Sequence, residues 1–297
     1  MAINKKKTTL VHHIAYMGIM TAINLIFILL ATYVPVFMFL PIIFLPFAST
    51  LVSYECKKRY YLIYAVASIG LCLIFNPNDT LFYVVPAVIT GFMIGVLLEK
   101  KINPFWMILF STLIEASLTF AFIPLINLIS DTDIVNTFLS AFKLSEFAYQ
   151  TELTYLFIFF LSLVQCSLSH YVLLTEIRRM GVEINTGVAS FAPYIIGLEL
   201  AVLLSLVFSF FYVSLAFVFL AISFYFAMFL LIDIIMSKRA LIYCVAVTLS
   251  VFSFFGFAIA YKSVVAPNGL LIMLLFPFSM GITSFLNNYL PKRKSNI

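Results

Sequence analysis

PFWMILFSTLIEASLTFAFIPLINLIS, residues 104–130, is apolar along its whole length and carries Glu115 near its middle. A helix that crosses a lipid bilayer needs about 20 residues, and this stretch is long enough. A carboxylate in the hydrocarbon costs roughly 2.5–3.5 kcal/mol even on the lenient insertion scale, so other parts of the protein must offset that cost. The stretch therefore predicts a membrane helix surrounded by further helices.

The composition of the whole chain is typical of a membrane protein. Hydrophobic residues are 64% of the 297 residues and charged residues are 10%, against about 45–50% and about 25% in ordinary globular domains. A soluble fold cannot bury this much apolar surface. The net charge of +5 comes from basic residues spread between hydrophobic runs. Nucleic acid binding needs a clustered basic face, so we expect no nucleic acid partner.

Basic clusters divide the chain into five hydrophobic blocks. The blocks are residues 11–54, 60–98, 104–177, 189–236 and 241–290. Each block is about long enough for two spans, and an even number of spans returns every basic cluster to the cytoplasmic side. The sequence thus predicts an all-α polytopic membrane protein of about ten helices in five hairpins, with both termini inside. Only Lys143 and Lys262 of the 17 Lys and Arg residues then lie outside.

Three of the expected turns contain Pro, Asn or Gly, and the fourth is placed by the length of its block alone. They are placed at residues 33–35, 76–79, 209–212 and 265–269. The third block instead has a longer outer segment, residues 131–152, in which IVNTFLSAFKLSEF has apolar residues at roughly helical spacing. Two pairs of small residues four apart, Gly18/Ala22 and Gly91/Gly95, permit close contact between helices.

Four polar residues at membrane depth are the candidate substrate-binding residues: Glu115, Gln165, His170 and Glu199. Thr112 and Thr119 share a helix face with Glu115. Counting back from the basic cluster at 178–179 places Gln165 at about the depth of Glu115, so we expect Glu115 to contact Gln165 or His170. Glu199 lies about as deep, which suggests a polar cavity shared with Glu115. An intramembrane carboxylate is a functional candidate by default, but a structural hydrogen bond between helices explains the same residues.

Enzymatic and metal-dependent functions have little support in the sequence. HExxH, GxSxG and Walker A patterns are absent. The four cysteines form no CxxC pair, so we expect neither a zinc site nor a cofactor. The apolar run that follows the basic N-terminus is too long for a signal-peptide core and is expected to be a retained first span. No soluble domain is expected, so any energy for transport must come from an ion gradient or from a partner.

The N-terminal part resembles a known class of transport proteins. Residues 12–70, HHIAYMGIMTAINLIFILLATYVPVFMFLPIIFLPFASTLVSYECKKRYYLIYAVASIG, look like the start of the substrate-binding S components of energy-coupling-factor transporters. The shared features are a basic N-terminus, a first span with small residues, a short outer loop and a second span that contains proline. This likeness covers roughly residues 8–177. The chain length and the later hairpins resemble the YybS-like family of uncharacterised bacterial membrane proteins.

The resemblance carries its own expectations. It implies a site for a small molecule near the outer face, and coupling to a separate membrane subunit and ATPases. It implies a partner-docking face at Ala15, Gly18 and Ala22, where Gly18 departs from the AxxxA pattern of the family. The last four spans have no counterpart in a six-helix S component. We therefore expect an S-component-like domain at residues 1–177 and an additional four-helix membrane segment at 189–290.

Two main hypotheses for the function follow. The first is a bacterial inner-membrane protein, S-component-like, that binds or transports a small solute. The second is a non-transporting membrane scaffold or assembly factor, whose deep polar residues only hold helices together. A weaker third hypothesis is an enzyme that acts on lipid beside residues 131–152. Glu115 fits a ligand site and a structural contact equally well, so the sequence does not decide between the first two hypotheses.

Overall fold

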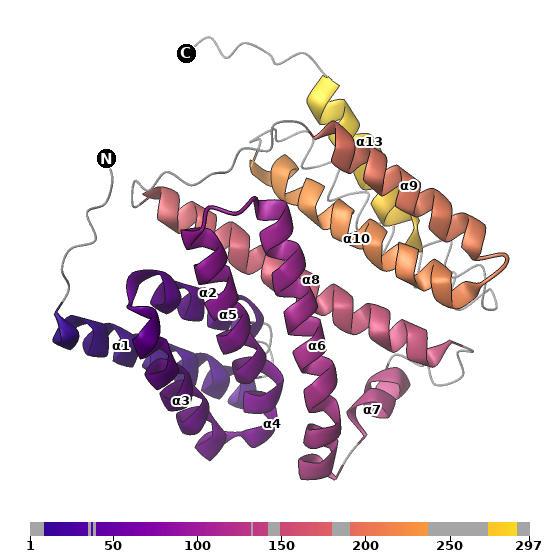
Figure 1. The fold of residues 1–297 in the computed structure, drawn as a ribbon. Coiled ribbons are helices and arrows are strands. Elements are labelled where there is room, and N and C mark those ends of the chain that lie inside the picture. Colours follow the sequence, from indigo (N-terminus) through magenta and orange to yellow (C-terminus); the bar gives the residue numbers. More distant parts are fainter. Residues whose placement is uncertain are drawn as a thin grey trace. The chain divides into compact units, whose positions relative to one another are not determined.

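The structure is a computed structural model, and every element that it describes is helical (Figure 1). It describes residues 9–34, 37, 40–131, 133–141, 149–179, 191–236 and 273–289, and none of these lies in a strand. The expected all-α class is confirmed for these residues. Outside the described residues lie the basic clusters at 5–7, 238–239 and 292–294, the lysines at 143 and 262, and the turn expected at 265–269.

Six helical segments are long and apolar enough to cross a membrane. They are α1 (Leu10–Tyr33), α3 (Lys58–Phe75), the segment Pro77–Glu99, α6 (Pro104–Ser130), the part Gln150–Thr175 of α8 (Gln150–Arg179), and the part Val213–Ile232 of α10 (Val213–Met236). Two further apolar helices are shorter, α2 (Leu40–Glu55) and α9 (Ala192–Phe208). The protein is thus a membrane protein with several apolar helices, and the count of ten spans stays a prediction.

The turn expected at 76–79 falls on Asn76 and the short helix that follows it, and the turn expected at 209–212 lies between two helices. Asn76 ends α3 and begins α4 (Pro77–Asp79), because its side-chain oxygen accepts a hydrogen bond from the Asp79 amide at 3.0 Å. The chain also turns between α9 and α10, in the stretch that block length alone had located. The outer segment contains one described helix, α7 (Ile134–Ala141), over the first part of the expected amphipathic stretch.

A short π-helical stretch, η2 (Thr80–Val84), interrupts the Pro77–Glu99 segment just before α5 (Val85–Glu99). Pro86 has no amide hydrogen, and its ring crowds the carbonyl four residues earlier, so the regular ladder cannot pass through it. The Val85 amide bonds to the Thr80 carbonyl instead, five residues back. The wider turn lets the chain continue as one span.

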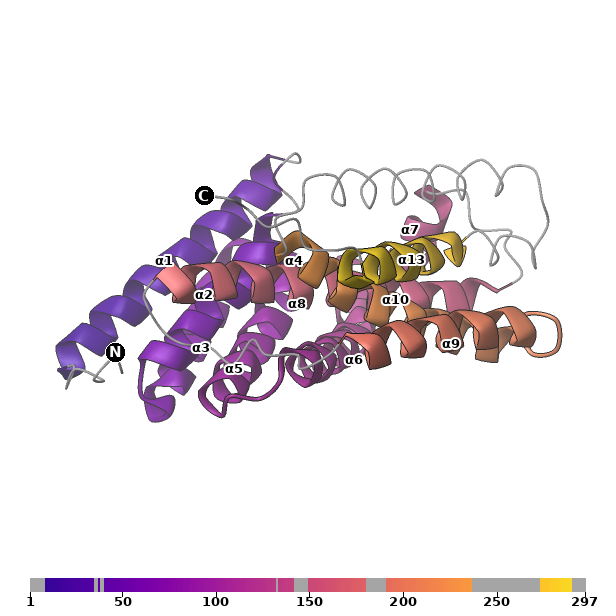
Figure 2. The ribbon, with the colours of Figure 1, turned by 90° about the horizontal axis from the view of Figure 1, so that it is seen from above.

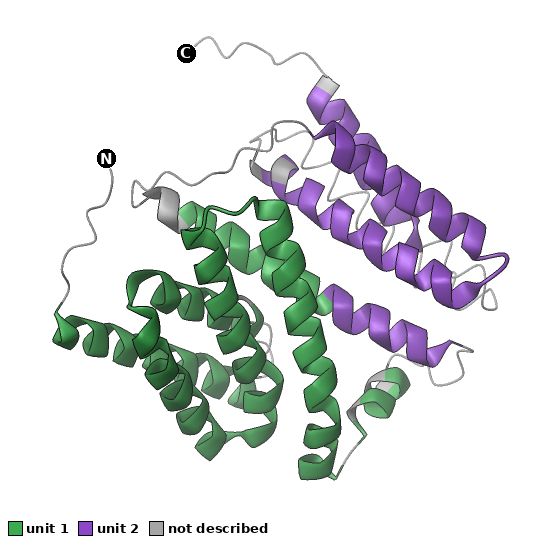
Figure 3. Ribbon diagram, in the orientation of Figure 1, with its two compact units in different colours: residues 1–142, 161–187 green, residues 143–160, 188–297 purple. Residues whose placement is uncertain are grey.

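The chain forms two compact units, which Figure 3 shows in different colours. Unit 1 contains residues 1–142 and 161–187, and unit 2 contains residues 143–160 and 188–297. Their border falls within α8, so this helix contributes its first part to unit 2 and its later part to unit 1. The sequence-based division at residues 177 and 189 stays a prediction.

Close contact between α2 and α5 organises the core of unit 1. Gly91 lies against Ser49, and Gly95 lies against Ser53, one turn further along both helices. The equal step of four residues shows that the two helices run parallel. The absence of a side chain at both glycines lets the backbones approach closely, as the Gly91/Gly95 spacing predicts.

The described part of unit 2 contains α9, α10 and α13 (Leu275–Tyr289), which lie side by side in Figure 1 and Figure 2. Their shared core contains Leu198 of α9, Leu230 of α10 and Met280 of α13, all fully buried. The Ser205 hydroxyl donates to the Ala216 carbonyl at 2.9 Å and ties α9 to α10 near their turn.

Candidate functional site

Glu115 lies on a buried polar face of α6. This helix begins at Pro104, whose missing amide is tolerated in a first turn, and Asn103 caps it by accepting a hydrogen bond from the Phe105 amide at 2.9 Å. Thr112 and Thr119 are buried on the same face, as their spacing predicts. The Glu115 side chain is 2% exposed, so it depends on the protein for its hydrogen bonds.

Two other helices donate hydrogen bonds to the Glu115 carboxylate. Thr90 of α5 donates from its hydroxyl to Oε2. Gln165 of α8 donates from Nε2 to Oε1 at 2.8 Å. All three side chains belong to unit 1 and are at most 8% exposed. The expected Glu115–Gln165 contact is therefore present, and Thr90 is a partner that the sequence analysis missed.

Both donors are neutral. Among the described residues, the ion pair Lys58–Glu99 involves neither Glu115 nor its partners, and no basic side chain contacts this carboxylate. A buried charge is normally offset by an opposite charge or by several hydrogen bonds. If Glu115 is ionised, its charge is therefore unbalanced. A proton or a cationic group of a ligand would restore that balance.

His170 lies further along α8 and has no partner of its own. Its side chain is 1% exposed, and neither Nδ1 nor Nε2 makes a hydrogen bond in the described structure. Ser167 lies one turn before it, and its buried hydroxyl is likewise unpaired. The expected alternative contact between Glu115 and His170 is not made, and Gln165 is the α8 residue that bonds to the carboxylate. A buried polar group without a partner costs about 1–3 kcal/mol, so these atoms are available to bind a ligand. We call Thr90, Glu115 and Gln165, together with Ser167 and His170 of α8, the polar centre; of these, Thr90 and Gln165 are the residues that hydrogen-bond to Glu115.

Glu199 belongs to unit 2 and is described with that unit. It is half-buried on α9, and its carboxylate lies against Gly281 of α13, where an added Cβ would overlap with it. The overlapping atom is the end of a flexible side chain, so Glu199 would have to move aside for a larger residue at position 281. A cavity that Glu199 shares with Glu115 stays a prediction.

The predicted docking residues Ala15, Gly18 and Ala22 share one face of α1, and all three are exposed. An added Cβ at Gly18 would meet no atom within 4 Å. The pairing of Gly18 and Ala22 with another helix is therefore not seen in the described part of the chain. This face is open to lipid or to a partner.

A second polar network in unit 1 also escaped the sequence analysis. Asn24 of α1 donates to the Tyr64 hydroxyl at 2.8 Å, and Ser49 shares a 3.0 Å hydrogen bond with the same hydroxyl. Thr21, one turn before Asn24, pairs with Ser68 at 3.1 Å. The spacing of Thr21 and Asn24 was a usable signal, because it places both on one face. This network ties α1, α2 and α3 together, although the Asn24 Oδ1 is buried without a partner in the described structure. We assign it a structural role.

No group of three His, Cys, Asp or Glu side chains is arranged to hold a metal ion within the described ranges.

The comparison with known families agrees with the membrane character of the chain. Residues 22–153 match a family described as "Predicted membrane protein (DUF2232)". The match begins within α1 and ends at the start of α8, so it includes Thr90 and Glu115 but not Gln165 or His170. No curated protein and no solved structure matches the chain. Over residues 22–153 the chain is therefore similar to a family that is defined by its membrane character.

Proposed function

We propose that this protein is a multi-pass protein of the bacterial inner membrane that binds a small solute at the polar centre. The observation that supports the proposal is the Glu115 carboxylate, which is buried and held by neutral donors, with the unpaired imidazole of His170 further along α8. A purely structural cluster would be expected to satisfy all its polar atoms. The proposal includes the topology of ten helices with both termini in the cytoplasm.

The chemistry of the polar centre favours a solute that carries a hydrogen-bond donor or a positive charge. Glu115 would accept from such a group, and its negative charge would be balanced on binding. His170 would supply a further hydrogen bond to the same solute. The expectation that Glu199 adds a second carboxylate rests on its depth in the sequence and stays a prediction.

Transport would require a partner under this proposal. S-component-like proteins pair with a membrane subunit and ATPases, and the open face at Ala15, Gly18 and Ala22 is the proposed docking surface. Gly18→Leu places a bulky side chain on this face, at a position where an added Cβ meets no atom within 4 Å. It should reduce recovery of the partner subunits while leaving the melting temperature of the purified protein unchanged.

A non-transporting scaffold is the second candidate. Both oxygens of Glu115 already accept a hydrogen bond from another helix, which is what a structural contact requires. In that case the polar centre holds α5, α6 and α8 together and binds nothing.

The variant Glu115→Gln separates the two candidates. The glutamine has nearly the same volume, and its carbonyl oxygen still accepts a hydrogen bond, but the charge is gone. We would purify both forms in mild detergent and identify co-purifying small molecules by mass spectrometry, with melting temperatures measured in parallel. Solute binding predicts a metabolite that is present with the wild type and lost with Glu115→Gln.

The scaffold hypothesis predicts the opposite pattern. No metabolite accompanies either form, and Glu115→Gln changes only the melting temperature, because one donor can no longer be satisfied. Glu199→Gln is the matched second variant. It should abolish co-purification of the same metabolite only if Glu199 contributes to the same site. If the metabolite still co-purifies, Glu199 is not part of that site.

A further inference from the structure

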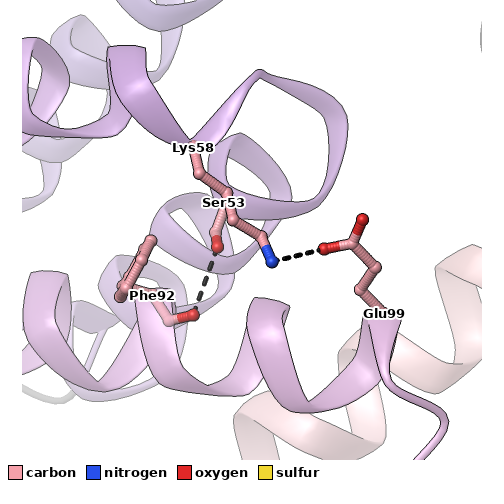
Figure 4. A network of polar contacts seen from close by, with 4 residues as sticks. All are labelled: Ser53, Lys58, Phe92 and Glu99. Carbon is pink, nitrogen blue, oxygen red and sulfur yellow. Dashed lines mark hydrogen bonds and ion pairs between the residues drawn. The ribbon is translucent and has the colours of Figure 1, made fainter.

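Two loops that are far apart in sequence meet at one end of unit 1. The parallel register of α2 and α5 brings their C-terminal ends together, and Figure 4 shows two contacts that fix them. The Ser53 hydroxyl donates to the Phe92 carbonyl at 3.2 Å, and Lys58 pairs with Glu99 at 2.8 Å. The loop after α2 therefore lies beside the loop after α5.

Five basic side chains gather at these two loops and at the start of α3, and all are exposed. We call them the basic surface: Lys57, Lys58, Arg59, Lys100 and Lys101. Lys58 is paired with Glu99, and the Arg59 guanidinium lies 4.6 Å from the centre of the Tyr60 ring. The other three lysines make no ion pair with any described residue. The surface therefore presents an unbalanced positive charge.

The only tryptophan of the chain lies at the same end. Trp106 is in the first turn of α6, close to Lys101 in sequence, and its side chain is 49% exposed. Exposed tryptophans of membrane proteins concentrate at the level of the lipid head groups. The basic surface is thus at the depth where head groups lie.

Two features of the basic surface are unfavourable by themselves, namely the backbone of Lys101 and the basic start of α3. Lys101 has a left-handed backbone with φ 54°. It follows α5 in a turn closed by hydrogen bonds from the Lys101 amide to Leu98 and from the Ile102 amide to Leu97, where glycine is the usual residue. The helix α3 begins directly after Lys57 with no acidic residue in its first turn. Basic residues there oppose the helix dipole. A bound anion would relieve this repulsion.

We propose that the basic surface binds the head groups of anionic phospholipids in the leaflet that it faces. Lysines near a membrane surface attract anionic lipids, and several act together within a Debye length. The proposal does not depend on the solute site, because it uses only the two loops and the membrane location of the protein.

Trp106 makes the proposal directly measurable. The full-length protein would be reconstituted into phosphatidylcholine vesicles that contain the same fraction of brominated phosphatidylglycerol or of brominated phosphatidylcholine. Bromine quenches tryptophan fluorescence on contact, so quenching reports which lipid occupies the site beside Trp106. We expect the anionic lipid to be favoured by at least about threefold, and the preference to fall as salt is raised. Equal quenching by both lipids at low salt would overturn the proposal.

Two variants test which residues are responsible. Lys101→Gly removes a charge and suits the left-handed backbone, so the melting temperature should stay equal or rise while the lipid preference falls. Lys57→Gln should also lower the lipid preference. The double variant of Lys57→Gln and Lys101→Gly should bring the ratio of anionic to neutral lipid at the site close to one. Lys143→Gln changes a lysine outside the basic surface and serves as the matched control, which should keep the full preference. A double variant that keeps the full preference would also overturn the proposal.

Discussion

The Glu115 carboxylate shows how one side chain depends on helices that are distant in sequence. Its two hydrogen-bond donors come from α5 and α8. Each donor replaces water that the bilayer cannot supply. Losing one donor leaves a buried oxygen unpaired, which costs more than the bond itself contributes.

The variant Thr90→Val tests this dependence. Valine keeps the shape of threonine and removes the hydroxyl that donates to Glu115. We expect a loss of about 1–2 kcal/mol in the free energy of unfolding, measured by thermal or denaturant unfolding in detergent. Thr175→Val is the control, because the Thr175 hydroxyl donates only to Tyr171 in its own helix, and it should change stability by less than about 0.5 kcal/mol. Equal effects of both variants would show that the Thr90 hydroxyl contributes nothing specific.

Part of the polar centre could be predicted from the sequence. Glu115 and Gln165 lie at similar distances from basic clusters in consecutive spans, so counting residues predicted their contact. Thr90 lies in the preceding hairpin, and its position beside Glu115 depends on how α5 packs against α6. Counting depth along the chain contains no such information. The same limit applies to Tyr64, which meets Asn24 and Ser49 only because α1, α2 and α3 come together.

At the level of helices, two pairs of small residues have the same spacing but different surroundings. Gly91 and Gly95 lie against α2, whereas Gly18 lies on the open face of α1. The spacing indicates that a close approach is sterically allowed. It does not identify the neighbour, because that depends on which face of the helix turns inward. The sequence therefore correctly predicted the close contact at Gly91 and Gly95, but it did not show which neighbour the face with Gly18 and Ala22 points toward.

Gly91→Ala and Gly18→Ala are a matched pair that measures this difference. An added Cβ at Gly91 would overlap with Ser49 and lie 2.9 Å from the Pro46 carbonyl oxygen, so the α2 backbone must move. We expect Gly91→Ala to destabilise the protein by about 1–3 kcal/mol in thermal unfolding. Gly18→Ala meets open space and should stabilise α1 by about 0.5–1 kcal/mol. Similar effects of the two substitutions would mean that α2 and α5 are not in close contact.

On the scale of the whole molecule, contacts within unit 1 support the even number of spans in the first two blocks. Lys58 begins α3 and Glu99 ends α5, and their ion pair brings both helix ends to one side. The ring of His13, near the start of α1, lies 5.6 Å from the ring of Tyr60, near the start of α3. The chain therefore leaves this side and returns to it twice. Although α2 has only 16 residues, it completes the first return.

The position of the C-terminus tests the proposed topology of the remaining blocks. We would fuse alkaline phosphatase, which needs an oxidising compartment for its disulfides, after residues 77, 101, 210 and 297, with green fluorescent protein at the same sites as the expression control. Five hairpins predict phosphatase activity after residues 77 and 210, and fluorescence after residues 101 and 297. An odd number of spans in residues 241–290 would reverse only the last fusion. Because the basic cluster at 292–294 would then lie outside, phosphatase activity at residue 297 would overturn both the count of ten and the charge rule from which it follows.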